Sequence, residues 1–172
     1  MSQPARAASR GFTLVELTLV ILIMGILLAL SIPKLGNLTG HNLHVSCRRL
    51  AATMKYILHR ATVRHTVYRL NYDLKTQEYW VTYRDENLEF VRDASSFARN
   101  AKLPQDVSFE DVVIVGRGKY REGEVQTHFF PKGWVDETLV HLRDGRGRQA
   151  SLHILPLSAR IKIYENYVEP NR

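Results

Sequence analysis

The sequence predicts an α+β fold in which one long N-terminal helix packs on antiparallel β-sheets. Apolar residues follow helical spacing as far as residue 65, and from residue 66 onward they alternate with a period of two. Short glycine-containing segments separate the alternating stretches, which is typical of hairpins. Of the 172 residues, about 107 follow the helical part, enough for one small domain with a modest core.

The first expected element is a transmembrane helix over residues 12–33. The run from Phe12 to Ile32 contains a single charged residue, Glu16. As a helix it is about 32 Å long, which is enough to cross the hydrocarbon core of a bilayer. A carboxylate in such a segment costs about 2.5–3.5 kcal/mol near the middle of the membrane and less near an end. A compensating positive group is therefore expected close to Glu16.

Residues 1–11 form a short cytoplasmic leader. They carry Arg6 and Arg10 and no acidic residue, so the N-terminus is expected to stay in the cytoplasm. Cutting the chain between Gly11 and Phe12 creates an α-amino group about one helical turn before Glu16. Such a cut supplies the positive group that Glu16 needs.

The second expected element is an amphipathic stem helix over residues 34–65. Pro33 lacks an N–H donor and usually ends or kinks a helix, so the two helical halves meet there. Beyond it, apolar residues recur at intervals of three and four and predict a stripe that lies on a sheet. The stripe consists of Leu43, Cys47, Leu50, Met54, Ile57 or Leu58, and Ala61.

Residues 66–172 are expected to form a periplasmic β-rich domain, with two small sheets. Glycines in Gly116–Gly123 and Asp144–Gly147 indicate turns, and Asp93–Lys102 is expected to be a loop or a short helix. The expected strands are Thr66–Tyr72, Glu78–Arg84, Leu88–Arg92, Val107–Val115, Glu124–Phe130, Thr138–Arg143, Ala150–Leu155 and Arg160–Glu165.

The N-terminal segment Arg10-Gly11-Phe12-Thr13-Leu14-Val15-Glu16, followed by the apolar run, resembles the processing signal of type IV pilins and type II secretion pseudopilins. The resemblance implies that a prepilin peptidase cuts after Gly11 and N-methylates Phe12. It also implies that Glu16 serves assembly by meeting the N-terminal amine of a neighbouring subunit. An ordinary signal peptide is disfavoured, because the residues after the apolar core make a poor small-residue cleavage site.

The C-terminal half resembles the GspH/FimT family of minor pseudopilins and minor pilins. The resemblance rests on Phe129-Phe130-Pro131-Lys132-Gly133-Trp134 and on Ile154-Leu155-Pro156-Leu157-Ser158-Ala159-Arg160, which are similar to the family's F-x-P-D-G and T-G-R segments. Leu103-Pro104-Gln105-Asp106-Val107 stands where the family often has an L-P-x-G-V turn. Two departures, Lys132 for Asp and Ser158-Ala159 for Thr-Gly, leave the conformations of these loops open.

No catalytic, metal or cofactor site is predicted. His41, His44 and Cys47 form an H-x-x-H-x-x-C string, but His41 and Cys47 are about 600° of helix rotation apart and do not share a face. Cys47 is therefore expected to pack as a small apolar residue. No Ser, Cys or Asp stands in a recognisable nucleophile setting, and an enzyme is not expected.

The chain is basic, with a formal charge of +7 that falls to +5 when the leader is removed. Seven Lys or Arg residues and no acid occur between Leu17 and Tyr72. Basic clusters can bind phosphate backbones, and Arg160 and Lys162 are the candidate nucleic-acid contacts. Pairing of these charges with acidic neighbouring subunits is favoured over nucleic acid, because acidic residues are interspersed with the basic ones.

The sequence thus predicts a minor pseudopilin of a type II secretion system, a structural subunit at or near the tip of the periplasmic pseudopilus that supports protein export. Its expected partners are the prepilin peptidase, the other major and minor pseudopilins, the inner membrane, which it spans once, and secreted protein substrates. The alternative is a FimT/FimU-like minor pilin of a type IV pilus that binds DNA during uptake. Many FimT-like chains carry paired cysteines, whereas this chain has one cysteine, and this difference favours the secretion role.

Overall fold

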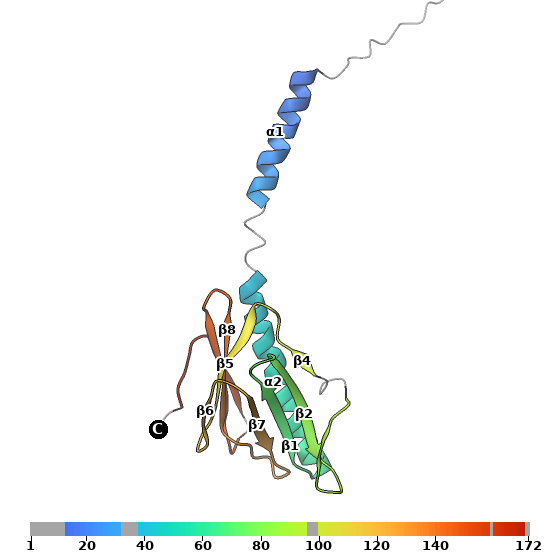
Figure 1. Cartoon of the computed structure of the whole chain (residues 1–172), viewed down its shortest axis with the longest axis vertical. Coiled ribbons are helices and arrows are strands. Elements are labelled where there is room, and N and C mark those ends of the chain that lie inside the picture. Colours follow the sequence, from blue (N-terminus) through green and yellow to red (C-terminus); the bar gives the residue numbers. More distant parts are fainter. Residues whose placement is uncertain (1–12, 32–37, 96–99, 159, 171–172) are drawn as a thin grey trace, which may run out of the picture. The chain divides into compact units, whose positions relative to one another are not determined.

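The computed structural model describes residues 13–31, 38–95, 100–158 and 160–170, and the chain divides into two compact units, residues 1–37 and 38–172. Among the described residues, the first unit contains helix α1, and the second unit contains helix α2 and the strands β1 to β10. Figure 1 shows α2 next to the strands. The helices are α1 (Leu14–Ser31) and α2 (Leu38–Arg64). The strands are β1 (Tyr68–Asp73), β2 (Glu78–Arg84), β3 (Phe90–Arg92), β4 (Ala101–Lys102), β5 (Val107–Ile114), β6 (Gly118–Tyr120), β7 (Glu124–Phe129), β8 (Thr138–Asp144), β9 (Gln149–Ile154) and β10 (Ile161–Tyr164).

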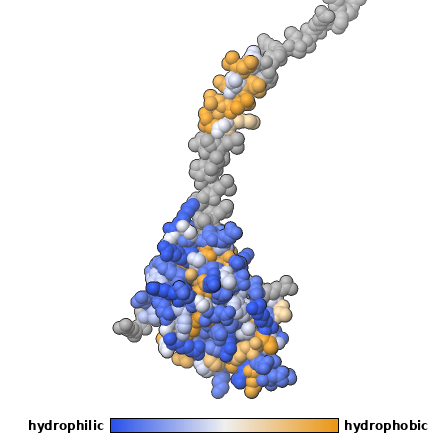
Figure 2. All heavy atoms as spheres, in the orientation of Figure 1, coloured by the Kyte–Doolittle hydropathy of each residue, from blue (hydrophilic) through white to orange (hydrophobic). Residues whose placement is uncertain are grey.

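Helix α1 is apolar on all sides. Its large apolar side chains are exposed from Leu14 to Leu27, and Figure 2 shows them as an almost continuous hydrophobic surface. Within the described parts of the chain, no helix is both long enough and apolar enough to cross a membrane. The predicted span of residues 12–33 includes residues 12, 32 and 33, which lie outside the described residues.

Helix α2 presents the predicted stripe to the core. Every predicted position on it is buried, and at the one ambiguous place Ile57 is fully buried whereas Leu58 is half-buried. Truncating a buried Leu, Ile or Met of this kind to Ala typically costs about 2–5 kcal/mol. The helix ends at Arg64, and His65 follows with a φ of 51°, the left-handed conformation that commonly ends helices.

The first sheet, sheet A, has the strand order β3-β2-β1-β7, with β4 also paired to β2, and all pairs are antiparallel. The β1–β2 hairpin closes at Asp73, whose carboxylate accepts hydrogen bonds from the backbone N–H groups of Lys75 (2.8 Å) and Thr76 (3.1 Å). This Asx turn is a standard way for Asp to reverse the chain. Strand β7 then returns from about fifty residues later in the chain to pair with the other side of β1.

The second sheet, sheet B, has the order β10-β9-β8-β5-β6 and is also antiparallel. The register of β5 against β8 shifts between Phe109 and Asp111, a β-bulge that leaves Glu110 without an opposite residue. After the bulge, Asp111 lies opposite His141. The bulge therefore decides which polar residues of β5 and β8 face each other.

One hydrophobic core joins α2 to both sheets. The helix contacts β1, β5, β7, β8 and β9, and buried residues of all these elements form a single cluster. Residues on the opposite faces of the sheets are not part of this cluster, although Leu139 and His141 are fully buried there. Something other than α2 must cover those two side chains.

The predicted strands agree with the observed ones to within a few residues at each end, and two sheets are present as expected. Two short strands were missed. Strand β6 lies inside the predicted turn Gly116–Gly123, and β4 lies at the end of Asp93–Lys102, of which residues 96–99 are outside the described residues. Both strands form by pairing with another strand. A segment of two or three residues is too short to show the alternation of apolar and polar residues that predicts a strand.

Candidate functional site

The described part of the N-terminal site is the first turn of α1. Gly11 and Phe12, the predicted cleavage and methylation residues, lie outside the described residues. Glu16 is exposed in this turn, and its backbone N–H donates to Thr13 Oγ1 at 3.3 Å and to the Thr13 carbonyl oxygen at 3.1 Å. Thr13 is therefore the N-cap of α1, and the Glu16 carboxylate lies at the helix end where negative charge is favourable.

This cap was missed in the sequence, although its signal is present. Thr13-x-x-Glu16 fits the capping-box pattern that often marks the start of a helix. The local cap and the predicted assembly role are compatible, because capping uses the Thr13 hydroxyl and leaves both carboxylate oxygens of Glu16 available for an amine.

The candidate nucleic-acid contacts lie at one edge of sheet B. Arg160 and Lys162 are exposed, and Lys162 belongs to the edge strand β10, opposite His153. Arg143, Arg146 and Arg148 form a second basic cluster at the β8–β9 turn, and this cluster is partly neutralised. Arg148 forms an ion pair with Asp144 at 2.7 Å, so this turn offers less free positive charge than its sequence indicates.

Asp144 organises that turn. Its Oδ1 accepts hydrogen bonds from the backbone N–H groups of Arg146 and Arg148, both at 2.9 Å, and its Oδ2 accepts one from Arg148 Nε at 2.7 Å. Burial alone raises the pKa of this carboxyl, but these hydrogen bonds and the Arg148 charge outweigh it, and the net pKa of Asp144 is lowered. The ionised carboxylate of Asp144 therefore holds this turn in place.

The H-x-x-H-x-x-C string does not form a metal site. His41 and His44 are exposed on α2, whereas Cys47 is fully buried in the core. Burial raises the pKa of the Cys47 thiol to about 11. Among the described residues, no group of three or more His, Cys, Asp or Glu side chains is arranged to hold a metal ion.

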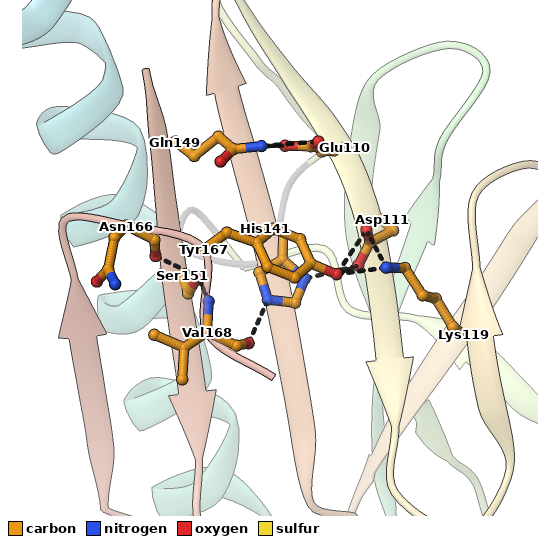
Figure 3. Close-up of polar contacts among 9 residues, drawn as sticks. All are labelled: Glu110, Asp111, Lys119, His141, Gln149, Ser151, Asn166, Tyr167 and Val168. Carbon is orange, nitrogen blue, oxygen red and sulfur yellow. Dashed lines mark hydrogen bonds and ion pairs between the residues drawn. The ribbon is translucent and has the colours of Figure 1, made fainter. Parts of the chain in front are cut away.

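A polar network that sequence reasoning missed lies on the face of sheet B away from α2 (Figure 3). At its centre, His141 Nδ1 and Asp111 Oδ1 are 2.6 Å apart, and both side chains are almost completely buried. Lys119 Nζ approaches Asp111 Oδ2 at 3.2 Å from the edge strand β6. The signals were the adjacent acids Glu110 and Asp111 in β5 and a histidine in β8, but nothing in the sequence shows that Asp111 and His141 are opposite each other.

Residues 165–170, called here the C-terminal segment, cover this network. The Tyr167 ring stacks on the His141 ring with 3.9 Å between centroids, and its hydroxyl donates to Asp111 Oδ2 at 3.1 Å (Figure 3). His141 Nε2 donates to the Val168 carbonyl oxygen at 2.9 Å. Ser151 Oγ donates to the Asn166 carbonyl oxygen at 2.7 Å and accepts from the Val168 N–H at 3.1 Å.

The charges in this network stabilise one another. The Tyr167 hydroxyl and the Asp111 carboxylate raise the pKa of Lys119, which therefore keeps its charge beside Asp111. Burial raises the pKa of Tyr167, with a smaller contribution from Asp111, so the hydroxyl stays protonated and donates. The network holds the C-terminal segment in place, and Lys119 and Tyr167 also line a small surface pocket together with Val113, Glu169 and Pro170.

The face of sheet A away from the core carries a second polar cluster, called here the arginine face: Arg69, Arg84, Arg92, Arg117 and His128. Cross-strand pairing places Arg69 opposite His128 on β7 and opposite Thr82 on β2, and Thr82 lies opposite Arg92 on β3. Arg117 contacts His128 Nδ1 at 3.3 Å from the β5–β6 turn. Basic residues from five separate segments therefore converge on one surface.

The loop that resembles the family's F-x-P-D-G segment forms a tight turn despite Lys132. The Gly133 N–H donates to the Phe130 carbonyl oxygen and the Phe130 N–H donates to the Trp134 carbonyl oxygen, both at 3.0 Å. Gly133 has a φ of 85°, where a residue without Cβ is favoured. The Phe130 and Trp134 rings stack with centroids 3.6 Å apart. The other departure, Ser158-Ala159, includes a residue outside the described part.

Comparison with known proteins supports both halves of this description. Residues 6–32 match the family of the prokaryotic N-terminal methylation motif. No curated protein sequence matches the chain. Two solved structures of the minor pseudopilin EpsH from the type II secretion system of Vibrio cholerae are similar to it, each with 8% sequence identity.

The first of these structures has a TM-score of 0.59 and covers 72% of this chain and 97% of its own. The second has a TM-score of 0.62 and covers 74% of this chain and 98% of its own. The similarity confirms the predicted type IV pilin-like α+β fold, with sheets in the C-terminal domain. The chain therefore joins a prokaryotic N-terminal methylation motif to a C-terminal domain with the fold of the minor pseudopilin EpsH.

Proposed function

We propose that this protein is a minor pseudopilin, a structural subunit of the periplasmic pseudopilus of a type II secretion system. The observation that carries the proposal is the combination of an N-terminal methylation motif with the EpsH fold in one chain. Each feature alone is weaker, because the motif covers only residues 6–32 and a fold alone does not fix a function.

The proposal assigns three residues of the N-terminal segment. A prepilin peptidase cuts after Gly11 and methylates the new terminus at Phe12. The helix over residues 12–33 then anchors the subunit in the inner membrane, with its N-terminus in the cytoplasm and its sheets in the periplasm. Glu16 pairs with the terminal amine of a neighbouring subunit, which gives the carboxylate a partner inside the filament.

The rest of the chain acts by contact rather than by catalysis. The polar network on sheet B ties the C-terminal segment to the sheet, with the carboxylate of Asp111 engaged by both His141 and Tyr167. In the proposed role, the domain at or near the pseudopilus tip meets other major and minor pseudopilins, and through the assembled pseudopilus it supports the export of folded proteins.

Mass spectrometry of the membrane-extracted chain tests the processing step. In cells with a prepilin peptidase, the mature protein should begin at N-methylated Phe12, and Gly11→Ala should leave the leader in place. An uncut wild-type chain, or a terminus beyond Ser31, is incompatible with the proposal. Deletion of the gene then separates the two related roles: loss of protein secretion supports the pseudopilin, whereas loss of pili or of DNA uptake supports a FimT/FimU-like minor pilin.

A further inference from the structure

The arginine face holds more positive charge than the described residues around it neutralise. Among the described residues, Asp136 is the one carboxylate in ion-pair contact with it, at 3.1 Å from Arg117 and 2.7 Å from His128 Nδ1. These contacts outweigh the effect of burial and lower the pKa of Asp136, which is therefore ionised and already engaged. Three arginines of the face have no carboxylate within ion-pair distance in the described part of the chain: Arg69, Arg84 and Arg92.

Arg69 shows the imbalance most clearly. It is half-buried, and its Nε is buried without a hydrogen-bond partner. Burial and the nearby charges of Arg117 and Arg84 lower the pKa of its guanidinium. A cation held among other cations, with an unsatisfied donor, is a costly arrangement that a bound anion would relieve.

Aromatic rings hold these arginines in position. The Arg69 guanidinium lies 3.2 Å from the centroid of the Phe90 ring, and the Arg92 guanidinium lies 5.1 Å from the centroid of the Trp80 ring. A guanidinium supported in this way can bind a carboxylate with two parallel hydrogen bonds, and in Arg92 one Nη1–H group already donates to Asn100 Oδ1 at 3.1 Å. The face is thus arranged to present positive charge. Arginines that only contacted solvent would not need to be held against aromatic rings.

Carboxylates lie on the same side of sheet A, four residues from Arg69 on β1 and four residues from His128 on β7. Asp73 lies opposite both Glu78 and Glu124 in the register, so the positive region ends in an acidic row. A phosphate backbone that followed the sheet would meet this row and be repelled. The aromatic rings on this face already have partners. Phe90 and Trp80 contact the guanidinium groups of Arg69 and Arg92, and Trp134 stacks on Phe130. These contacts disfavour stacking of nucleic-acid bases on the rings.

We propose that the arginine face docks an acidic segment of another protein subunit, with Arg69, Arg84 and Arg92 as its carboxylate-binding residues. The inference rests on the proposed function, because it names the surface through which this subunit would meet a neighbour. Charge complementarity carries it: three guanidinium groups without a carboxylate partner among the described residues, two of them held against aromatic rings, match carboxylates spaced along a protein segment.

Binding of a labelled poly-L-glutamate to the full-length chain in non-ionic detergent tests the inference, with fluorescence anisotropy as the readout. The test variant is Arg84→Gln/Arg92→Gln, since both side chains are exposed. The matched control is Arg160→Gln/Lys162→Gln, which removes the same charge from exposed positions at the edge of sheet B. We expect salt-sensitive binding that falls about tenfold or more in the test variant and less than about twofold in the control.

Equal losses in the two variants would show unspecific attraction to a basic protein and would overturn the inference. Tighter binding of a labelled thymidine oligonucleotide than of poly-L-glutamate would overturn it in favour of nucleic acid, and loss of that binding in the control variant would support the predicted contacts at Arg160 and Lys162. If sedimentation shows that the wild-type chain self-associates and the test variant does not, the partner is a second copy of this chain, and docking of a different subunit is overturned.

Two further measurements keep the result interpretable. Unchanged thermal unfolding of the test variant shows that it is folded, and Arg69→Gln provides an independent variant at the centre of the face. The binding assay needs no secretion system, so its failure can be told apart from failure of the proposed function. A chain that is processed and assembled but binds no poly-L-glutamate refutes this inference alone, and an unprocessed chain that binds it refutes the proposed function alone.

Discussion

Asp111 and His141 lie opposite each other in β5 and β8, and their side chains meet at 2.6 Å on a sheet face that α2 does not cover. The pair is buried because the C-terminal segment folds back over it and brings Tyr167 onto the imidazole ring. A buried ion pair contributes little by itself, but removing one member leaves the other buried and uncompensated. The end of the chain and the middle of sheet B therefore depend on each other.

Replacing Asp111 with Asn should destabilise the protein by about 3 kcal/mol or more, because His141 and Lys119 then lose their common counter-charge. Urea unfolding of the full-length chain in detergent, followed by the fluorescence of its two tryptophans, measures the change. Glu78→Gln is the control, since its ion pair with Lys102 is largely exposed and should contribute about 1 kcal/mol or less. Equal effects of the two substitutions would contradict the structural role of Asp111.

Tyr167 offers a graded test of the C-terminal segment. Tyr167→Phe keeps the ring on His141 but removes the hydroxyl that bonds Asp111, and should cost about 1 kcal/mol. Tyr167→Ala also removes the stacked ring, and should cost about 3 kcal/mol. The free energy of unfolding should therefore fall in the order Tyr, Phe, Ala. Wild-type stability of Tyr167→Ala would show that the segment does not stay on the sheet.

Cys47 should be unreactive in the native protein. Its thiol is fully buried and its pKa is raised to about 11, so near pH 8 almost none of it is the reactive thiolate. An aromatic disulfide reagent should modify it only at the rate of unfolding, and readily in urea. His44→Cys places a thiol at an exposed position one turn earlier and should react at once. Rapid native labelling of the wild-type chain would contradict the packing of α2 described above.

Acid should weaken the protein partly through Asp144. Because its pKa is lower in the folded protein than in the unfolded chain, its contribution is fully present above an unfolded pKa of about 3.9 and is lost as the pH falls below it. Asp144→Asn should therefore be less stable than wild type near pH 6, and the difference should shrink toward about pH 3. Glu122→Gln, at an exposed site, should keep the wild-type pH dependence. A constant difference between Asp144→Asn and wild type would contradict this assignment.

Glu16 should be needed for assembly but not for insertion. Glu16→Val removes a charge that is costly in lipid, so the chain should still insert, be cut after Gly11 and keep a folded periplasmic domain. Its recovery with other pseudopilins after cross-linking should fall, and secretion should fall with it. Thr13→Val is the control, because it removes the helix cap and leaves the carboxylate. Co-purification and secretion at wild-type levels in Glu16→Val would exclude the assembly role.

The order of the longer elements could be read from the sequence because each has a local signal, which the short strands β4 and β6 lack. Helical spacing along α2 identified its buried face before any partner was known, and the structure buries the whole stripe. Alternation identified eight strands in the C-terminal half, and resemblance in short motifs identified the fold class that the comparison with EpsH confirms. The N-terminal motif, too, is a linear pattern, which is why residues 6–32 match a family without help from structure.

Only the tertiary structure decided which strands pair and what the outer faces carry. Strand β7 pairs with β1 rather than with its sequence neighbour β6, and β5 pairs with β8. These pairings depend on how each whole sheet packs against α2, and the sequence of a single strand does not reveal its partner. The bulge after Phe109 sets Asp111 against His141, and cross-strand register brings Arg69, Arg92 and His128 onto one face. A shift of one residue would turn these side chains to the opposite side, so contacts of this kind exist only once long-range packing has fixed the register.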